Sequence, residues 1–131
     1  MRLAKVIKKR QLDFLSETLD SELIQNGITT VVLIDLAGNI LTDLSHGKHD
    51  FDTYSLAALT AGNFGAVTAL SDQIGEPELT LLFNQGKMLS IYFRKLLADY
   101  ILIAIFDKSI SLGYLRLKID SLENFLEKGF A

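Results

Sequence analysis

The sequence predicts an α+β protein with three layers, in which one five-stranded antiparallel sheet lies between helices. Apolar residues recur at helical spacing in three segments, and five shorter runs are rich in β-branched or large apolar residues. These segments follow one another as helix, two strands, helix, three strands, helix. A chain of 131 residues without a recognisable linker fits one domain, so we expect residues 1–131 to fold as a single unit.

The first three elements form a helix and a hairpin. Four leucines at steps of three and four predict an amphipathic helix over Val6–Gln25, which ends at Gly27. Thr29–Leu36 alternates little between apolar and polar residues, which is typical of a strand covered on both faces. A short turn then leads into a second strand over Asn39–Leu44.

The last four elements form a three-stranded meander and a closing helix. Strands are expected over Glu78–Phe83, Met88–Arg94 and Tyr100–Phe106, because turn residues separate these runs. Asp107 can accept hydrogen bonds from the first amides of the final helix. Leucine and isoleucine then recur at helical spacing until the chain reaches Gly129.

The central helix, expected over Thr53–Gly75, is unusual because residues 53–71 contain no charged residue and no histidine. Its large apolar residues share one face, which we expect to pack on the sheet, with Asn63 there hydrogen-bonded to backbone. The other face is small and uncharged, so we predict that it meets another polypeptide rather than water. A helix buried within one large core is the alternative. The large face comprises Leu56, Leu59, Val67, Leu70 and Ile74, and the predicted interface comprises Ala57, Ala58, Ala61, Gly62, Gly65, Ala66 and Ala69.

No catalytic, cofactor-binding or metal-binding constellation stands out. The sequence has neither a phosphate-binding P-loop nor a dinucleotide fingerprint nor a nucleophile elbow. His46 and His49 stand near two aspartates at a spacing that metal ligands can have, but we favour a solvated loop because no other ligand cluster accompanies them. Arg94 and Arg116 carry no signal for an arginine finger.

The composition limits the classes of partner and the cellular compartment that we expect. The net charge of −3 argues against a nucleic-acid-binding surface. The basic start from Arg2 to Arg10 could touch anionic lipid or an acidic partner, although a solvated helix end is the simpler interpretation. The chain has no cysteine and no apolar run long enough for a signal peptide or a membrane-inserted segment. We therefore expect a soluble cytoplasmic protein.

From about Ile28 to Ile119 the chain resembles the roadblock/dynein light chain family, and within it the prokaryotic MglB-type proteins. The resemblance rests on the hairpin VVLIDLAGNIL, the alanine-rich helix after it, the hairpin LTLLFNQGKMLSIYF, the apolar strand YILIAIF and the closing SLGYLRLKI. It covers about seven-tenths of the chain and includes no catalytic signature.

This resemblance implies a roadblock-like fold and a homodimer in which the central helices lie side by side and the third strands pair. Leu79, Leu81 and Phe83 of the third strand would then join the interface. The resemblance also implies a Ras-like small GTPase of the MglA type as partner, whose hydrolysis such dimers can stimulate by repositioning the GTPase's own residues.

Two other functional classes stay open. A structural homodimer that serves as a scaffold would show no nucleotide-dependent binding to a GTPase. A small-molecule sensor would need a roomy pocket between the sheet and the central helix. An enzyme is the least supported class, because no acid–base pair is evident.

Overall fold

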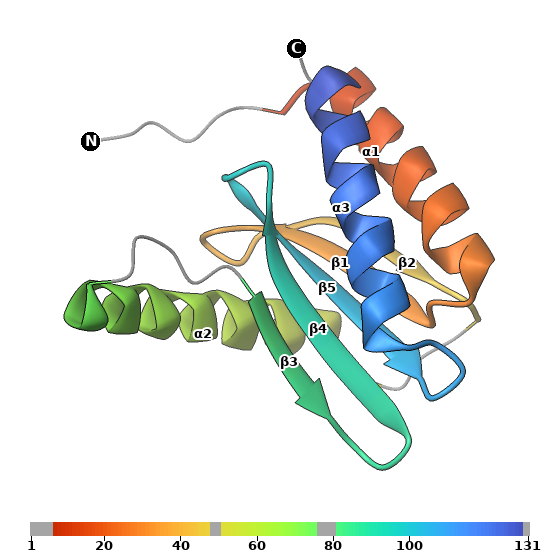
Figure 1. Ribbon diagram of the computed structural model, residues 1–131. Coiled ribbons are helices and arrows are strands. Elements are labelled where there is room, and N and C mark those ends of the chain that lie inside the picture. Colours follow the sequence, from red (N-terminus) through yellow and green to blue (C-terminus); the bar gives the residue numbers. More distant parts are fainter. Residues whose placement is uncertain (1–6, 48–50, 76–80, 130–131) are drawn as a thin grey trace.

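The computed structural model describes residues 7–47, 51–75 and 81–129. The predicted α+β class is confirmed, with helices on both faces of an antiparallel sheet (Figure 1). The helices are α1 (Lys9–Glu22), α2 (Thr53–Ile74) and α3 (Leu112–Gly129), with a short 3₁₀ helix at Ile24–Asn26. The strands are β1 (Thr30–Asp35), β2 (Ile40–Ser45), β3 (Leu81–Gln85), β4 (Leu89–Leu96) and β5 (Tyr100–Asp107).

The sheet has the strand order β2-β1-β5-β4-β3, so β1 and β5 lie at its centre. In this central pair, Thr30 lies opposite Ile105 and Asp35 opposite Tyr100. Almost every residue of both strands is buried, as expected for strands covered on both faces. Strand β3 lies at the outer edge, paired on one side with β4.

Element boundaries differ from the sequence predictions in the first helix and in the third strand. The first helix is shorter than Val6–Gln25, because its last turn is replaced by the 3₁₀ helix and by Gly27 at φ +103°. The third strand is observed at Leu81–Gln85 and not from Glu78, which lies outside the described residues.

Two hydrophobic clusters occupy the two sides of the sheet. The larger cluster joins α1 and α3 to one face, through residues such as Leu19, Leu102 and Ile119, none of which is exposed. The smaller cluster joins the other face to α2, through Phe64 and Ala57. The bulk of the buried apolar surface, and hence of the hydrophobic stabilisation, thus lies on the α1–α3 side.

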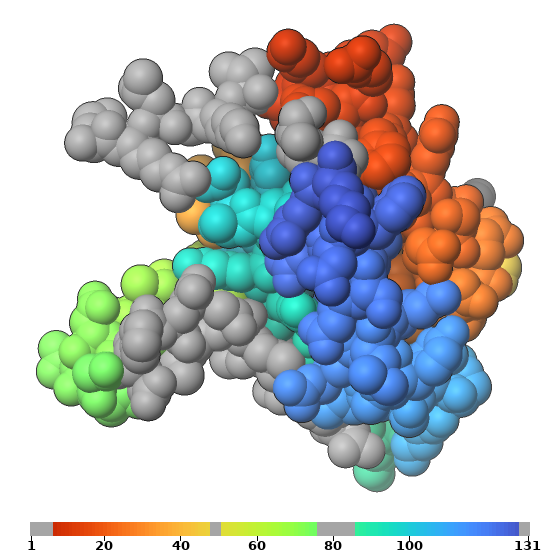
Figure 2. All heavy atoms as spheres, turned by 45° about the horizontal axis from the view of Figure 1, so that its top comes forward, coloured from red at the N-terminus to blue at the C-terminus, as the bar shows by residue number. Residues whose placement is uncertain are grey.

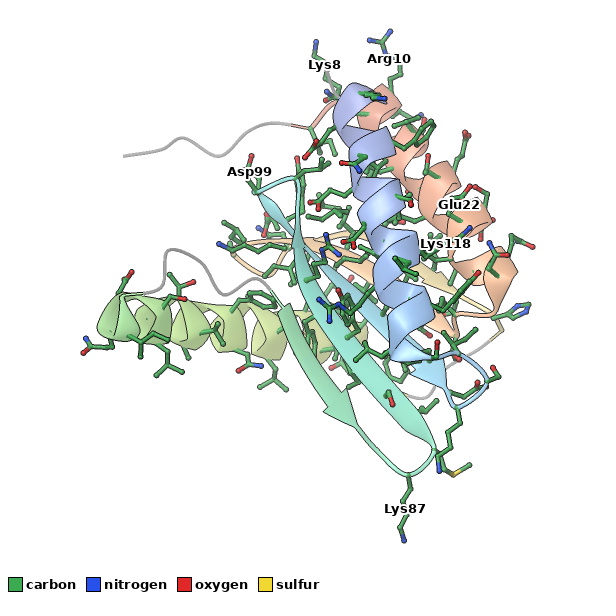
Figure 3. All side chains as sticks on the ribbon, in the orientation of Figure 1. Lys8, Arg10, Glu22, Lys87, Asp99 and Lys118 are labelled. Atoms are coloured by element: carbon green, nitrogen blue, oxygen red, sulfur yellow. The ribbon has the colours of Figure 1, made fainter. Side chains whose placement is uncertain are left out.

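A charged network fastens α3 to the sheet on that larger side. Arg94 of β4 lies 2.5 Å from Asp120 and 3.0 Å from Glu123, both on α3. The other Glu123 carboxylate oxygen accepts from the Leu97 amide at 3.1 Å, in the turn after β4. On the same side, Lys118 pairs with Glu22 of α1 at 2.9 Å (Figure 3).

Helix α2 is capped at both ends. The Asp52 carboxylate accepts from the Tyr54 amide at 3.0 Å and from the Ser55 hydroxyl at 2.8 Å. At the other end, Gly75 takes a left-handed conformation with φ +74°, which favours glycine. These caps explain why the helix begins and ends where the sequence predicts.

Acidification should loosen the N-terminal end of α2. The hydrogen bonds from Ser55 and from the Tyr54 amide hold the pKa of Asp52 below its ordinary value of 3.8. A depressed folded-state pKa stabilises the fold above the unfolded value, and this contribution is lost as the pH falls through the lowered pKa. We expect the Tyr54 amide to lose hydrogen-exchange protection as the pH falls below 3.8 and through the lowered pKa of Asp52.

The matched variant for this test is Asp52→Asn, which keeps an acceptor at the cap but has no carboxyl group to protonate. Its Tyr54 amide should show the same protection throughout that range. Equal acid sensitivity in the two proteins, followed by NMR, would contradict the role assigned to the Asp52 carboxylate.

Candidate functional site

The candidate site is the surface of α2 together with the sheet edge beside it. Figure 1 shows α2 on the side of the sheet opposite α1 and α3, with its C-terminal half extending past the sheet edge. Its packing against the sheet is concentrated on β1 and β2. In Figure 2, the green atoms of α2 stand out from the body of the molecule. Much of this helix, which carries no charge over residues 53–71, is therefore left without a covering layer.

The face of α2 that meets the sheet is not the one predicted from the sequence. The buried residues recur at steps of three and four, and Phe64 is the largest of them. They are Ala57, Thr60, Phe64, Val67 and Ser71. Only Val67 of the predicted large face is among them, so the prediction that this face packs on the sheet is wrong.

The turn between β1 and β2 explains why small residues lie on the buried side. Gly38, at φ +94°, brings this turn against α2, and a β-carbon added there would lie 3.4 Å from the Ala61 β-carbon and 3.5 Å from the Ala57 carbonyl oxygen. Larger side chains at these two alanines would push the turn away. Ala57 is fully buried, so its prediction as a partner contact is wrong, and Ala61 is half-buried.

Three large apolar residues of α2 are instead exposed along one side of the helix, next to the half-buried Leu56. Leu59 is 73% exposed, Leu70 57% and Ile74 65%, values that are high for leucine and isoleucine. We call this side the groove-side row, comprising Leu56, Leu59, Asn63, Ala66, Leu70 and Ile74. Asn63 is exposed, contrary to prediction, and its carboxamide has no hydrogen-bond partner among the described residues.

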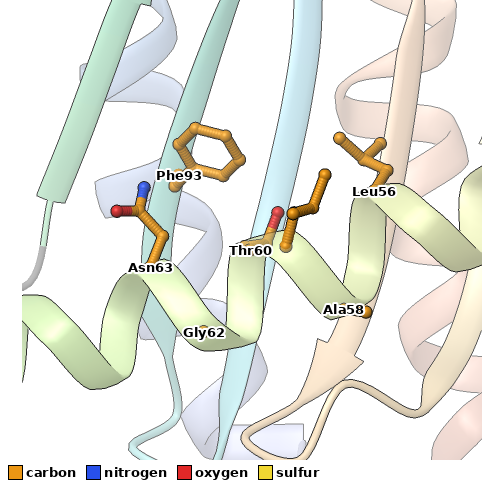
Figure 4. A pocket seen from close by; sticks show the side chains of 7 residues that line it. Leu56, Ala58, Thr60, Gly62, Asn63 and Phe93 are labelled. Atoms are coloured by element: carbon orange, nitrogen blue, oxygen red, sulfur yellow. The ribbon is translucent and has the colours of Figure 1, made fainter.

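A groove of about 620 Å³ separates this row from the sheet and is lined by Leu56, Leu59, Asn63 and Phe93 among others (Figure 4). Figure 4 shows the Asn63 side chain extending from α2 toward the side on which Phe93 of β4 lies. The groove is open to solvent rather than enclosed. Its shape suits a polypeptide element better than a small ligand, which usually sits in a deeper cavity.

A second exposed side of α2 carries the remaining small residues. We call it the small-residue row, comprising Ala58, Gly62, Gly65 and Ala69, all of which are exposed. A side chain added at Gly62 or Gly65 would meet no other part of the described structure. Four of the seven small residues predicted at an interface thus share this surface, and Ala66 lies in the groove-side row.

The predicted strand residues are placed only in part. Leu81 and Phe83 belong to β3, the edge strand next to the groove, and Leu79 lies outside the described residues.

The residues considered for catalysis do not converge on this surface. Arg94 is held by Asp120 and Glu123 on the α3 side of the sheet, and Arg116 is exposed on α3 itself. His46 follows β2, whereas His49 lies outside the described residues. Across the described ranges, no group of three or more acidic or histidine side chains could hold a metal ion.

The basic N-terminal residues that the structure describes lie at the N-terminal end of α1. Figure 3 shows Lys8 and Arg10 pointing into solvent there, on the side of the sheet away from α2. No helix in the described part of the chain has the length and apolar character of a membrane span.

Comparison with known proteins identifies related folds. The Roadblock/LC7 domain matches residues 15–106. The chain is 31% identical to Myxococcus xanthus MglB, covering 96% of this chain and 94% of that one, with a TM-score of 0.85. It is 24% identical to the gliding protein MglB of Thermus thermophilus, with a TM-score of 0.83 and coverages of 98% and 96%. Comparison with curated proteins gives no match.

Proposed function

Because this chain belongs to the Roadblock/LC7 domain family, we propose that it is a homodimeric regulatory protein that binds a Ras-like small GTPase of the MglA type. The observation that carries this proposal is the exposed apolar surface of α2, seen in a chain that is 31% identical to an MglB protein over nearly its whole length. A helix with leucines more than half exposed and no charge over residues 53–71 is best explained by contacts between proteins.

We assign the groove-side row to a second copy of the chain. Leu59, Leu70 and Ile74 are large enough to supply most of the buried apolar area of a helix pair, and the groove beside them is open. Strand β3 lies at the neighbouring sheet edge, so its free side can pair with the same strand of the second copy. Oligomer formation is also suggested by a 23% identical structure described as MglB with tetrameric arrangement.

We assign the small-residue row to the GTPase. A row of alanines and glycines makes a flat surface on which another backbone can approach closely. Ala58 and Gly62 of this row also line the groove, whereas Gly65 and Ala69 do not. A dimer built through the groove-side row therefore leaves the Gly65–Ala69 half of the row accessible. The small-residue rows of both protomers then offer two docking surfaces.

Regulation of hydrolysis would come from positioning rather than from a supplied catalytic group. Arg94, which follows the groove residue Phe93 in β4, is engaged by two carboxylates on the opposite side of the sheet. We propose that hydrolysis is accelerated by repositioning groups within the GTPase. An ordered catalytic residue can change the rate by several orders of magnitude.

The direct test mixes the protein with the Ras-like GTPases encoded in its own genome, each loaded with GDP or with a GTP analogue. Complex mass and GTP turnover are measured. We expect one GTPase to form a nucleotide-dependent complex with a dimer of this chain. A dimer that binds none of them in either state would support the scaffold function instead.

Replacement of Gly65 by arginine should abolish GTPase binding without unfolding the protein. The introduced arginine side chain has open space at this position. Replacing a glycine within a helix also stabilises the helix by about 1 kcal/mol. A long charged side chain would nonetheless hold the GTPase away from the small-residue row. We expect affinity to fall by at least about 100-fold, since a desolvated unpaired charge costs several kcal/mol.

Gly113→Arg is the matched control, because Gly113 is a helical glycine of α3 that also has open space around it. It should bind the GTPase like the wild type. Ala61→Arg is less informative, since Ala61 packs against the Gly38 turn and its replacement would also disturb the fold. Normal binding by Gly65→Arg would exclude the small-residue row as the docking surface.

A further inference from the structure

The four central residues of the groove-side row lie at symmetric positions along α2. Leu59 and Leu70 lie at equal distances from the point midway between residues 64 and 65, and so do Asn63 and Ala66. This point is close to the middle of the helix, which runs from Thr53 to Ile74. A two-fold contact requires that a surface complement its own copy, and a row with this symmetry does so when two helices pack antiparallel.

The position of α2 on the sheet favours the same arrangement. Its N-terminal half forms the groove with β4, and its C-terminal half extends past the sheet edge (Figures 1 and 4). In an antiparallel pair, the extended half of each helix reaches the groove of the other copy. Leu70 of one helix then packs against Leu59 of its partner, so each protomer completes the other's groove.

Asn63 is the polar exception in this row, and the pairing places it near the two-fold axis. It lies one and a half residues from the axis, so the two Asn63 residues are about 4.5 Å apart along the helices. Each faces Ala66 of the other helix, whose methyl group leaves room for a carboxamide. The two carboxamides, each with a donor and an acceptor, can then hydrogen-bond to each other.

We propose that Asn63 sets the register of the α2–α2 contact, an inference that rests on the homodimer proposed above. A shift by one helical turn in one direction moves the carboxamide against Leu70 of the other copy, where it is buried without a partner. A shift in the other direction separates Leu59 from Leu70. A single polar residue in an apolar helix seam fixes register in this way in coiled coils.

Single-cysteine variants test the register directly, because the natural chain contains no cysteine. Leu59→Cys protein is mixed with Leu70→Cys protein, or with Ile74→Cys protein, and treated with a short bifunctional thiol cross-linker. The proposed register predicts that the 59–70 pair cross-links at least about fivefold faster than the 59–74 pair. The 59–74 pair comes together only in the shifted register, which is less populated by at least this factor because it buries one unpaired amide. Each variant alone should give little cross-linked dimer.

Adding Asn63→Leu to all three cysteine variants should bring the two rates to within about twofold, because the shifted register no longer buries an unpaired amide. Thr68→Leu, an exposed position of α2 outside both rows, should leave the ratio unchanged. An unchanged ratio in the Asn63→Leu proteins would overturn the proposal, as would efficient cross-linking of each variant with itself, which indicates parallel helices. A monomeric wild-type protein would instead refute the homodimer itself.

Discussion

Replacing Leu59 with aspartate is expected to dissociate the dimer while leaving the protomer folded. Leu59 is 73% exposed in the protomer, so its loss removes little packing from the fold. In the proposed dimer, the substitution puts a carboxylate into the apolar seam twice, once from each copy, where it has no cationic partner. We expect the dimer dissociation constant, measured by analytical ultracentrifugation, to rise by at least about 100-fold.

Leu117→Asp provides a closely matched control. Leu117 is 71% exposed and lies on α3, across the sheet from α2. The two variants therefore make the same chemical change at nearly the same exposure on opposite sides of the molecule. Equal dimer stability in both would show that the groove-side row is not the contact surface.

Truncating Phe64 to alanine is expected to release α2 from the sheet. Phe64 is 3% exposed and is the largest α2 side chain in the smaller hydrophobic cluster. Phenylalanine-to-alanine changes in cores cost about 3–5 kcal/mol, and α2 has few other buried side chains to offset such a loss. The larger cluster on the α1–α3 side is untouched, so we expect amide exchange to accelerate throughout α2 but not in β1 or β5.

Phe125→Ala serves as the comparison, since Phe125 is 54% exposed on α3 and contacts Phe14 with ring centroids 5.6 Å apart. It should cost about 1 kcal/mol, the size of one aromatic pair, and leave exchange in α2 unchanged. If Phe64→Ala instead exposes the β1 and β5 amides together with those of α2, the two clusters unfold as one unit.

The fold class could be predicted from the sequence because its elements carry local signals. The near-continuous apolar runs of β1 and β5 predicted strands covered on both faces, and both are central. The leucine spacing of α1 and α3 predicted helices with one buried stripe, and these stripes form the larger cluster. Such patterns depend on neighbouring residues only, so they need no knowledge of the tertiary structure.

The orientation of α2 could not be predicted in the same way. A helix that is apolar all round contains no contrast to show which side meets its own sheet. The deciding factor is a long-range contact, the approach of the Gly38 turn to Ala57 and Ala61. This contact turns the two alanines inward and leaves Leu59 and Leu70 outside. The sequence therefore indicated that α2 has two apolar sides, but it placed the wrong one of them on the sheet.

The ion pairs that Arg94 forms could not be predicted from local sequence patterns either. Its partners Asp120 and Glu123 are more than twenty residues away, on an element that only the folded sheet brings near. The spacing along the chain gave no reason to connect them. The ion-pair partners of Arg94 could be identified only once the packing of α3 against β4 was known.

The central pairing of β1 with β5 also governs the order in which the protein can be built. Thr30 and its partner Ile105 are separated by most of the chain, so a ribosome releases β1, β2 and all of α2 before β5 can complete the sheet. During that interval the apolar sides of α2 have no sheet to cover them. Long-range strand pairing of this kind slows folding and prolongs the exposure of apolar surface to other chains. The helix that we propose to contact partners in the finished protein is thus also a segment whose apolar surface is exposed during synthesis.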